Sequence, residues 1–446
     1  MCEPTNHEPG KAFAEGMAAV RTGRRTLLQA GAAGMLFSTA VAAPAEAARR
    51  AAPRVRPDTK RRAYVLVVDG CRPDEITASV TPHLFALREG GLHHPRASAM
   101  PVMETIPNHV MMMTGVRPDR TGVPANSIYD RAEGKGRTMD RPEDIKAVTV
   151  IEQLNQRGFT TGTVLSKDYL YGVFGERPTH RWEPAPIIPV SGHAPDLFTM
   201  NATLSMIEEF DPHLVFVNLG DIDRMGHSDF TGTNVRLARQ VALADTDALV
   251  GRFVDMLKSS GRWEDSIVIV VADHSMDWSD PDRLVSLQPV LQADPLLAGN
   301  IQIEDNGGAD LVYWTGPDSQ RNQAIKRIRQ LARGVDGVLV AHRRDKPWLR
   351  LGPEAGDVVV FCKAGWRFSD PNQLSNPIPG NHGHPATRRI PFFIGGGHPN
   401  VPQGKNSSAG AHTVDVAPTV AAFFGIRRTP GGWDGRNRLR PGRALI

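Results

Sequence analysis

Three segments of the chain have the composition of buried strands, and each one runs into aspartate. The segments and their aspartates are Tyr64–Val68 before Asp69, Val215–Leu219 before Asp221 and Asp223, and Ile267–Ala272 before Asp273. Two histidines, His227 and His274, follow closely. In an open α/β sheet the ligand crevice lies beyond the carboxyl ends of the strands, so these carboxylates and imidazoles are expected to meet there. Both are ligands of divalent metals, which indicates a metal-dependent hydrolase.

A threonine stands at the start of a predicted helix that follows Pro101. Thr105 immediately precedes this helix, and Pro107 lies in its first turn. The N-terminus of a helix offers unpaired N–H groups and the positive end of a dipole, which suits a phosphate oxyanion. A hydroxyl at this position could be a nucleophile if a metal lowers its pKa. The alternative is that Thr105 is a plain helix cap.

Two further patterns belong with these residues. Asp223 and His227 are four residues apart, which on a helical turn places both side chains on one face, although such a pair alone is more often structural. The loop Asn381-His382-Gly383-His384 offers a third histidine among turn-forming residues, where the backbone can approach a ligand closely. Their occurrence together with the strand-end aspartates favours one shared site.

The elements that must position these residues alternate between strand and helix along the chain. This alternation predicts an α/β fold with a mostly parallel central sheet and helices on both faces. Helices are expected to start near Thr81 and to occupy about 151–155, 241–257 and 413–424, and strands are expected at about 163–165 and 389–397. No internal repeat is visible.

The pattern becomes mixed between about 278 and 375. Strands are expected at 309–314 and 357–361, with a helix at 322–332 between them. We interpret this segment as a smaller α+β cap insertion in a catalytic domain that spans 63–446. The alternative is that it continues the main sheet.

The first 47 residues have the features of a secretory signal. Arg24 and Arg25 precede a stretch of small apolar residues at 30–43, and Ala45-Glu46-Ala47 forms an A-x-A cleavage site. The paired arginines resemble a twin-arginine export signal. An uncleaved anchor is the alternative, but the apolar run is short for a membrane span. We therefore expect a secreted or extracytoplasmic protein without a stable membrane span after leader removal, and a disordered spacer at 48–62.

Composition limits the partners. The 446 residues are 40% hydrophobic and 22% charged, which permits a large core and one or two domains. Lysine and arginine number 52 against 48 acidic residues, and the net charge of +4 is too small to indicate a nucleic-acid partner. Beyond the leader, Cys71 and Cys362 permit one disulfide without requiring it. The oligomeric state stays open.

Five motifs occur in the order seen in the alkaline phosphatase superfamily. The chain most closely resembles the type I phosphodiesterase/nucleotide pyrophosphatase branch, over about residues 63 to 425. The motifs are Val67-Val68-Asp69-Gly70, Glu104-Thr105-Ile106-Pro107-Asn108-His109, Asp223-Arg224-Met225-Gly226-His227, Ala272-Asp273-His274 and Asn381-His382-Gly383.

This resemblance implies two zinc ions, with other divalent metals as alternatives, and a small phosphorylated substrate. It assigns one ion to Asp69, Thr105, Asp273 and His274, and the other to Asp223, His227 and His382. It also implies that Thr105 is the nucleophile and forms a covalent phosphothreonine. Asn126 matches the asparagine that contacts a non-bridging phosphoryl oxygen in this branch, although without the resemblance it would be interpreted as a turn residue.

Lys167 helps to indicate which class of phosphorylated substrate the protein binds. It resembles the lysine that phosphonoacetate hydrolases and some threonine-type phosphomonoesterases direct at a substrate oxyanion; a solvated surface lysine is the alternative. In those relatives a second cation often lies two residues further on, where this chain has Tyr169. This departure favours diester cleavage over recognition of a dianion.

The sequence thus predicts an exported two-zinc hydrolase of phosphodiester or pyrophosphate bonds. Phosphomonoester hydrolysis and phosphonoacetate-type C–P cleavage, both using Lys167, remain alternatives within the enzyme class. Sulfate ester cleavage is disfavoured because Thr105 stands where sulfatases carry a cysteine or serine that becomes formylglycine. A non-catalytic surface binding protein is the more remote alternative, since the ligand set and Thr105 are complete.

Overall fold

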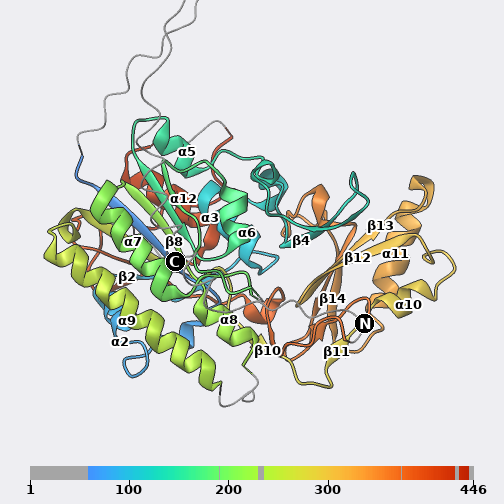
Figure 1. Ribbon diagram of the computed structural model, residues 1–446. Helices are drawn as coiled ribbons and strands as arrows, with labels where there is room; N and C mark the ends of the chain where they lie inside the picture. The colour runs from blue at the N-terminus through green and yellow to red at the C-terminus, as the bar shows by residue number, and fades with distance from the viewer. Residues whose placement is uncertain (1–58, 190, 230–235, 373, 427–430, 441–446) are drawn as a thin grey trace, which may run out of the picture. The chain divides into compact units, whose positions relative to one another are not determined.

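An eight-stranded sheet organises the part of the chain that this computed structural model describes (Figure 1). The described residues are 59–189, 191–229, 236–372, 374–426 and 431–440. The predicted leader at 1–47 lies outside them, as does most of the predicted spacer at 48–62. Across the sheet the strands are β19 (Lys405–Asn406), β2 (Leu92–His93), β18 (Phe392–Gly395), β9 (Ser266–Val271), β1 (Arg62–Val68), β8 (Leu214–Leu219), β6 (Thr161–Leu165) and β7 (His180–Trp182).

The direction of the strands makes this sheet mostly parallel. Strand β18 pairs antiparallel with both β2 and β9, whereas the other pairings in the sheet are parallel. The predicted α/β class with a mostly parallel central sheet is therefore confirmed.

Both faces of the sheet are covered, which explains why its central strands are continuous apolar runs. Neighbouring residues of a strand face opposite sides. Tyr64 of β1 packs edge-on against Phe253 on one side. The next residue, Val65, pairs in register with Phe216 of β8, whose ring contacts His109 on the other side.

The helices divide accordingly between the two faces (Figure 1). One group packs together on the Tyr64 side and comprises α2 (Pro82–Gly90), α7 (Asp196–Phe210) and α9 (Leu237–Ser259). The other group lies on the Phe216 side and comprises α3 (Thr105–Thr114), α5 (Val150–Asn155), α6 (Asp168–Phe174) and α12 (Val416–Phe423). None of the helices in the described residues has the length and hydrophobicity needed to cross a membrane.

A second, antiparallel sheet lies within the segment 278–375. Its strands, in order, are β12 (Ile301–Asn306), β13 (Ala309–Trp314), β15 (Val358–Cys362) and β14 (Val338–Arg343), and helices α10 (Gln288–Gln292) and α11 (Arg321–Ala332) accompany it. It has its own apolar cluster, which includes Trp314 and Ile328. The end of β12 reaches the main body, because Asn306 donates to the backbone oxygen of Ser127 and accepts from its backbone nitrogen.

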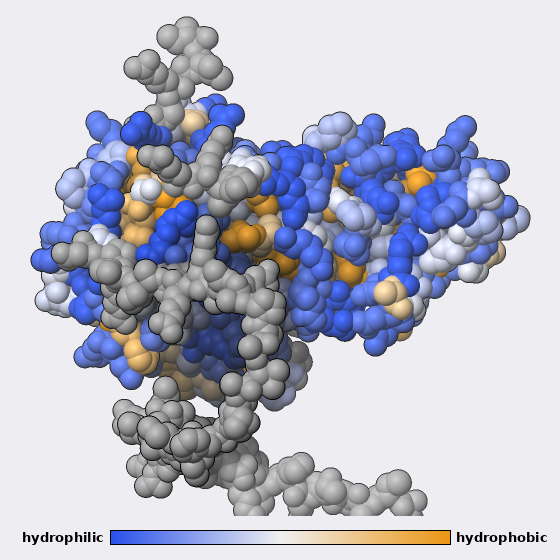
Figure 2. Space-filling view, turned by 90° about the horizontal axis from the view of Figure 1, so that it is seen from above, coloured by the Kyte–Doolittle hydropathy of each residue, from blue (hydrophilic) through white to orange (hydrophobic). Residues whose placement is uncertain are grey.

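Several short elements complete the fold. They are α4 (Pro118–Thr121), α8 (Asp221–His227) and the strand pairs β3 (Ala97–Ser98) with β20 (Ala411–His412), β4 (Ser127–Asp130) with β5 (Lys135–Thr138), β10 (Asp277–Trp278) with β17 (Gly380–Asn381), and β11 (Leu284–Val285) with β16 (Arg367–Phe368). Cys71 and Cys362 are both buried free thiols. On the face shown in Figure 2, polar residues predominate and hydrophobic residues form separate patches.

Candidate active site

The main strands deliver the predicted ligands to one place. Asp69 follows β1, Asp223 and His227 lie on α8 directly after β8, and Asp273 with His274 follows β9. Thr105 is the first residue of α3, and His382 follows β17. The structure therefore brings together all seven residues for which the sequence predicted metal ligation, as the distances below establish.

One cluster forms around Asp223. Its Oδ1 atom lies 3.3 Å from Nε2 of His227 and 3.9 Å from Nε2 of His382, and the two Nε2 atoms are 3.0 Å apart. His227 uses Nδ1 to donate to the backbone oxygen of Gly380 at 2.9 Å, and Nδ1 of His382 pairs with Glu104 at 2.8 Å. Both imidazoles are thus anchored through Nδ1 and direct Nε2 at a common point.

A second cluster forms around His274. Its Nε2 atom lies 3.2 Å from Oγ1 of Thr105, 3.3 Å from Oδ2 of Asp273 and 3.7 Å from Oδ1 of Asp69. Its Nδ1 atom donates to the backbone oxygen of Ser275 at 3.0 Å. The plain helix-cap alternative for Thr105 does not describe this geometry, because Glu104 occupies the N-cap position and the Thr105 hydroxyl faces the cluster.

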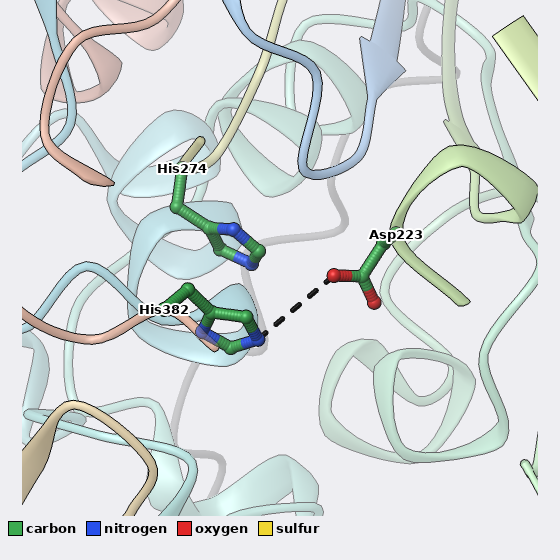
Figure 3. Close-up of side chains that lie close together, drawn as sticks. All are labelled: Asp223, His274 and His382. Atoms are coloured by element: carbon green, nitrogen blue, oxygen red, sulfur yellow. Dashed lines mark ion pairs between the residues drawn. The ribbon is translucent and has the colours of Figure 1, made fainter. Parts of the chain in front are cut away.

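The clusters have the chemistry of metal sites. Oδ1 of Asp69, Oδ1 of Asp223 and Oδ2 of Asp273 are buried and have no hydrogen-bond partner among the described residues. Such atoms are costly unless a cation satisfies them. Asp223, His274 and His382 also come close enough to share one ion, and Figure 3 shows their polar atoms turned toward one another. Oxygen and imidazole nitrogen in this arrangement fit a divalent metal such as zinc.

The pKa shifts of His274 and Asp223 favour the forms that bind metal, whereas the shift of Asp69 opposes its ionisation when no cation is bound. Burial, followed by the charge of Asp273, raises the pKa of Asp69. Burial also lowers the pKa of His274 well below its usual range, so this imidazole is neutral. Burial alone would raise the pKa of Asp223, but the ammonium of Lys167 holds it well below its usual range. A neutral imidazole and an ionised carboxylate are the forms that bind metal.

His109 belongs to the site although the sequence assigned it no role. With Asp69 and Asp273 it forms a group of potential metal ligands. Both of its ring nitrogens are already engaged, since Nδ1 donates to the backbone oxygen of Thr105 at 2.8 Å and Nε2 accepts from Asn218 at 3.0 Å. His109 therefore holds the start of α3 in place. The available signal was its position four residues after Thr105, one helical turn away.

Lys167 lies between the two clusters. Its Nζ atom is 2.8 Å from Oδ2 of Asp69 and 2.8 Å from Oδ2 of Asp223, and its side chain is 0% exposed. The alternative of a solvated surface lysine does not hold. The ammonium is directed at carboxylates rather than into the open cavity, so its predicted contact with a substrate oxyanion stays a prediction.

A cavity of about 260 Å³ opens beside the clusters. Asn126 lines it, and its Oδ1 accepts from the backbone nitrogen of Ile106 at 2.8 Å, so the amide nitrogen is the group left to bind a ligand. The second sheet and its β12–β13 turn contribute Asp305, Asn306 and Gly307 to the same cavity. Other lining residues are Glu104, Thr105, Ser127, Tyr169, Asp223, Arg224, His227, Asn376, Ile378, Gly380, Asn381 and His382.

Comparisons with known proteins define the class. The family model described as "Type I phosphodiesterase / nucleotide pyrophosphatase" matches residues 63–385. The chain is 26% identical over 392 residues to human ectonucleotide pyrophosphatase/phosphodiesterase family member 5, covering 84% of this chain and 76% of that protein. It is 24% identical over 372 residues to human bis(5'-adenosyl)-triphosphatase ENPP4, covering 81% and 78%.

Solved structures agree on the fold. Murine ectonucleotide pyrophosphatase/phosphodiesterase 5, in a structure of an inactive variant in complex with AMP, superposes with a TM-score of 0.68 at 17% identity, covering 82% of this chain and 96% of that one. The human counterpart gives a TM-score of 0.69 at 17% identity, covering 84% and 97%.

The chain belongs to the type I phosphodiesterase/nucleotide pyrophosphatase family. It is a phosphoric ester hydrolase, as the sequence predicted. The family is metal-dependent and acts on small phosphorylated substrates such as nucleotides.

Proposed function

We propose that the protein hydrolyses phosphodiester or pyrophosphate bonds through a covalent intermediate on Thr105. The observation that carries this proposal is the position of the Thr105 hydroxyl. It lies at the N-terminus of α3, 3.2 Å from Nε2 of His274, and lines the cavity together with Asn126. A nucleophile, an oxyanion donor and a helix N-terminus thus surround the space where a phosphoryl group would sit.

Each group of residues has a separate role in the proposed reaction. Asp69, Thr105, Asp273 and His274 would hold one zinc ion, and Asp223, His227 and His382 would hold the other. When bound, these ions would lower the pKa of the Thr105 hydroxyl and offset negative charge on the phosphoryl and leaving oxygens. Thr105 Oγ1 forms a bond to phosphorus as the bond from phosphorus to the leaving oxygen breaks, and Asn126 donates to a non-bridging oxygen. Water then cleaves the phosphothreonine and restores the hydroxyl.

Nucleotides are the substrate class that we propose. Two relatives are named as a bis(5'-adenosyl)-triphosphatase and as a phosphodiesterase solved with AMP. The cavity of about 260 Å³ is polar and accessible beside Thr105. We expect the phosphate nearest the nucleoside to be attacked, with a nucleoside monophosphate as the product.

We further propose that residues 1–47 export the protein through a twin-arginine route and that 278–375 form a cap inserted in the catalytic domain. The end of β12, in this segment, lines the cavity through Asp305 and Asn306. Export and cleavage are tested by locating a reporter fused after residue 47, with Arg24 and Arg25 replaced by lysine as the control.

Paired hydrolysis of bis-p-nitrophenyl phosphate and p-nitrophenyl phosphate tests the catalytic proposal. Activity should require added zinc, should be faster on the diester, and should fall by at least roughly a thousandfold in Thr105→Ala because the covalent route is lost. Thr105→Ser should retain part of the activity, and exposed Thr138→Ala should retain all of it.

Two results would overturn this proposal. Full activity in Thr105→Ala would exclude the covalent route, and full activity after complete chelation would exclude the metals. Faster turnover of the monoester would instead assign the protein as a phosphomonoesterase.

A further inference from the structure

Arg224 is a cation in the cavity that forms no ion pair with any residue in the described part of the chain. It follows Asp223 on α8 and lines the cavity with Tyr169 and His227. Its Nε atom is buried without a hydrogen-bond partner, and its guanidinium forms no ion pair or hydrogen bond with any residue that the structure describes. A buried N–H donor is normally satisfied, so the Nε donor of Arg224 is available to a ligand.

The other buried cations near the site are already engaged. The ammonium of Lys167 contacts Asp69 and Asp223 at 2.8 Å. The guanidinium of Arg239 donates to both carboxylate oxygens of Glu75, at 2.6 and 2.7 Å. Arg224 differs from both, since it lines the cavity and forms no ion pair with a carboxylate among the described residues, although the charges of Asp223 and Asp69 act on it.

The surroundings of Arg224 suit an anion from the substrate. Burial raises the pKa of Tyr169, so its phenol is neutral and does not compete as an anion. Tyr169, on α6, stands at the position where the resembling enzymes often carry a second cation. Arg224, on α8, lines the same cavity and supplies a cation there from a different element. The sequence could not indicate this pairing because 55 residues separate the two positions.

The location of Arg224 indicates which part of the substrate it meets. It neighbours the Asp223 cluster, whereas the nucleophile Thr105 belongs to the His274 cluster. In an in-line displacement the leaving group departs on the side opposite the nucleophile. A guanidinium on the Asp223 side is thus placed to bind the leaving group, and its planar fork matches phosphate oxygens.

We propose that Arg224 is a specificity residue that binds the phosphate oxygens of a leaving group, so that it favours substrates whose leaving group itself carries phosphate. This inference rests on the proposed function and adds the chemical class of the leaving group to it. Diesters whose leaving group carries no phosphate make no use of Arg224.

Two substrates with the same transferred group test the inference. Thymidine triphosphate and the p-nitrophenyl ester of thymidine monophosphate both place thymidylate on Thr105, but they release pyrophosphate and p-nitrophenolate respectively. In Arg224→Gln, kcat/KM for the triphosphate should fall by about 10- to 100-fold, the range for loss of a charge-assisted hydrogen bond. The value for the p-nitrophenyl ester should stay unchanged.

Variants and a binding measurement complete the test. Arg224→Lys should recover part of the loss, and Arg252→Gln removes one exposed arginine outside the cavity as the charge-matched control. Calorimetric affinity for pyrophosphate should weaken by a similar factor in Arg224→Gln. Equal losses on both substrates, or unchanged triphosphate kinetics and pyrophosphate affinity, would overturn the role of Arg224. Failure of the proposed function is distinguishable, because wild-type protein would then hydrolyse neither substrate.

Discussion

Glu104 shows how a residue outside the proposed ligand set can control a ligand. It is the N-cap residue of α3, and its carboxylate pairs with Nδ1 of His382 from a distant loop at 2.8 Å. Burial alone would lower the pKa of His382, but Glu104 raises it to about 9. The contact fixes the ring so that Nε2 points at the Asp223 cluster, and it increases the basicity of that nitrogen.

Replacing Glu104 by glutamine should therefore weaken metal binding. We expect zinc affinity to fall by roughly 10- to 100-fold, the usual cost of removing the partner of a ligating histidine. Competition against a chromophoric chelator measures this affinity. Exposed Glu143→Gln is the matched control and should bind zinc as the wild type does. Equal affinities in the two variants would show that Glu104 does not support His382.

At the residue scale, sequence reasoning could reach the candidate metal ligands but not the residues that hold them in position. Asp69 and Asp273 follow long apolar strands, so their meeting at one sheet edge was predictable. Glu104 and His109 act through contacts to His382 and to the backbone of Thr105. Those contacts depend on three-dimensional packing. In the sequence, Glu104 and His109 only lie close to Thr105, and nothing there indicates what they contact.

At the element scale, the turn after β1 determines the space available to α8. Gly70 has a φ of +70°, in the left-handed region that favours glycine. A Cβ atom at this position would lie 3.1 Å from both Cβ and Oδ1 of Asp223. The turn and the first turn of α8 are thus packed so closely that only glycine leaves Asp223 in place.

Gly70→Ala should cost both stability and activity, whereas Gly134→Ala should cost stability alone. Gly134 has a nearly identical φ of +69° but nothing within 4 Å of its added Cβ. Each substitution should destabilise the protein by about 1–2 kcal/mol through backbone strain. Urea unfolding and diester hydrolysis, measured side by side, separate the two effects. If both variants keep full activity, the close packing of Gly70 against Asp223 has no catalytic consequence.

The elements also differ in how well their position and length could be predicted from the sequence. Strands β1, β8 and β9 were predictable because an uninterrupted apolar run is typical of a strand covered on both faces. Helix α9 extends beyond the expected 241–257 to Leu237–Ser259, since helix ends carry weaker patterns than helix centres. Strand β17, which presents His382, has two residues. A pair of residues has no periodicity, so its place beside β10 came only from the structure.

At the scale of the whole molecule, the site joins parts of the chain that are far apart. The proposed ligands range from Asp69 to His382. They come from the ends of three central strands, from the start of α3 and from a loop beyond the second sheet. Three buried carboxylates meet there, and Lys167 is the cation that contacts two of them. A metal ion that coordinates the remaining oxygens would link these distant segments. Metal binding should therefore stabilise the folded protein as well as support catalysis.

Metal removal should therefore lower the melting temperature without unfolding the protein at 25 °C, because Lys167 still offsets part of the repulsion between Asp69 and Asp223. A ligand present at about a hundredfold excess over its Kd stabilises the folded state by about 2.7 kcal/mol per site. Calorimetry of the chelated protein, before and after zinc is restored, should record a reversible rise of several degrees. Asp223→Asn weakens one cluster and should reduce this rise, while Thr138→Ala should leave it intact. If zinc does not change the melting temperature, the unpaired carboxylate oxygens do not bind it. The assignment of both clusters as metal sites would then be wrong.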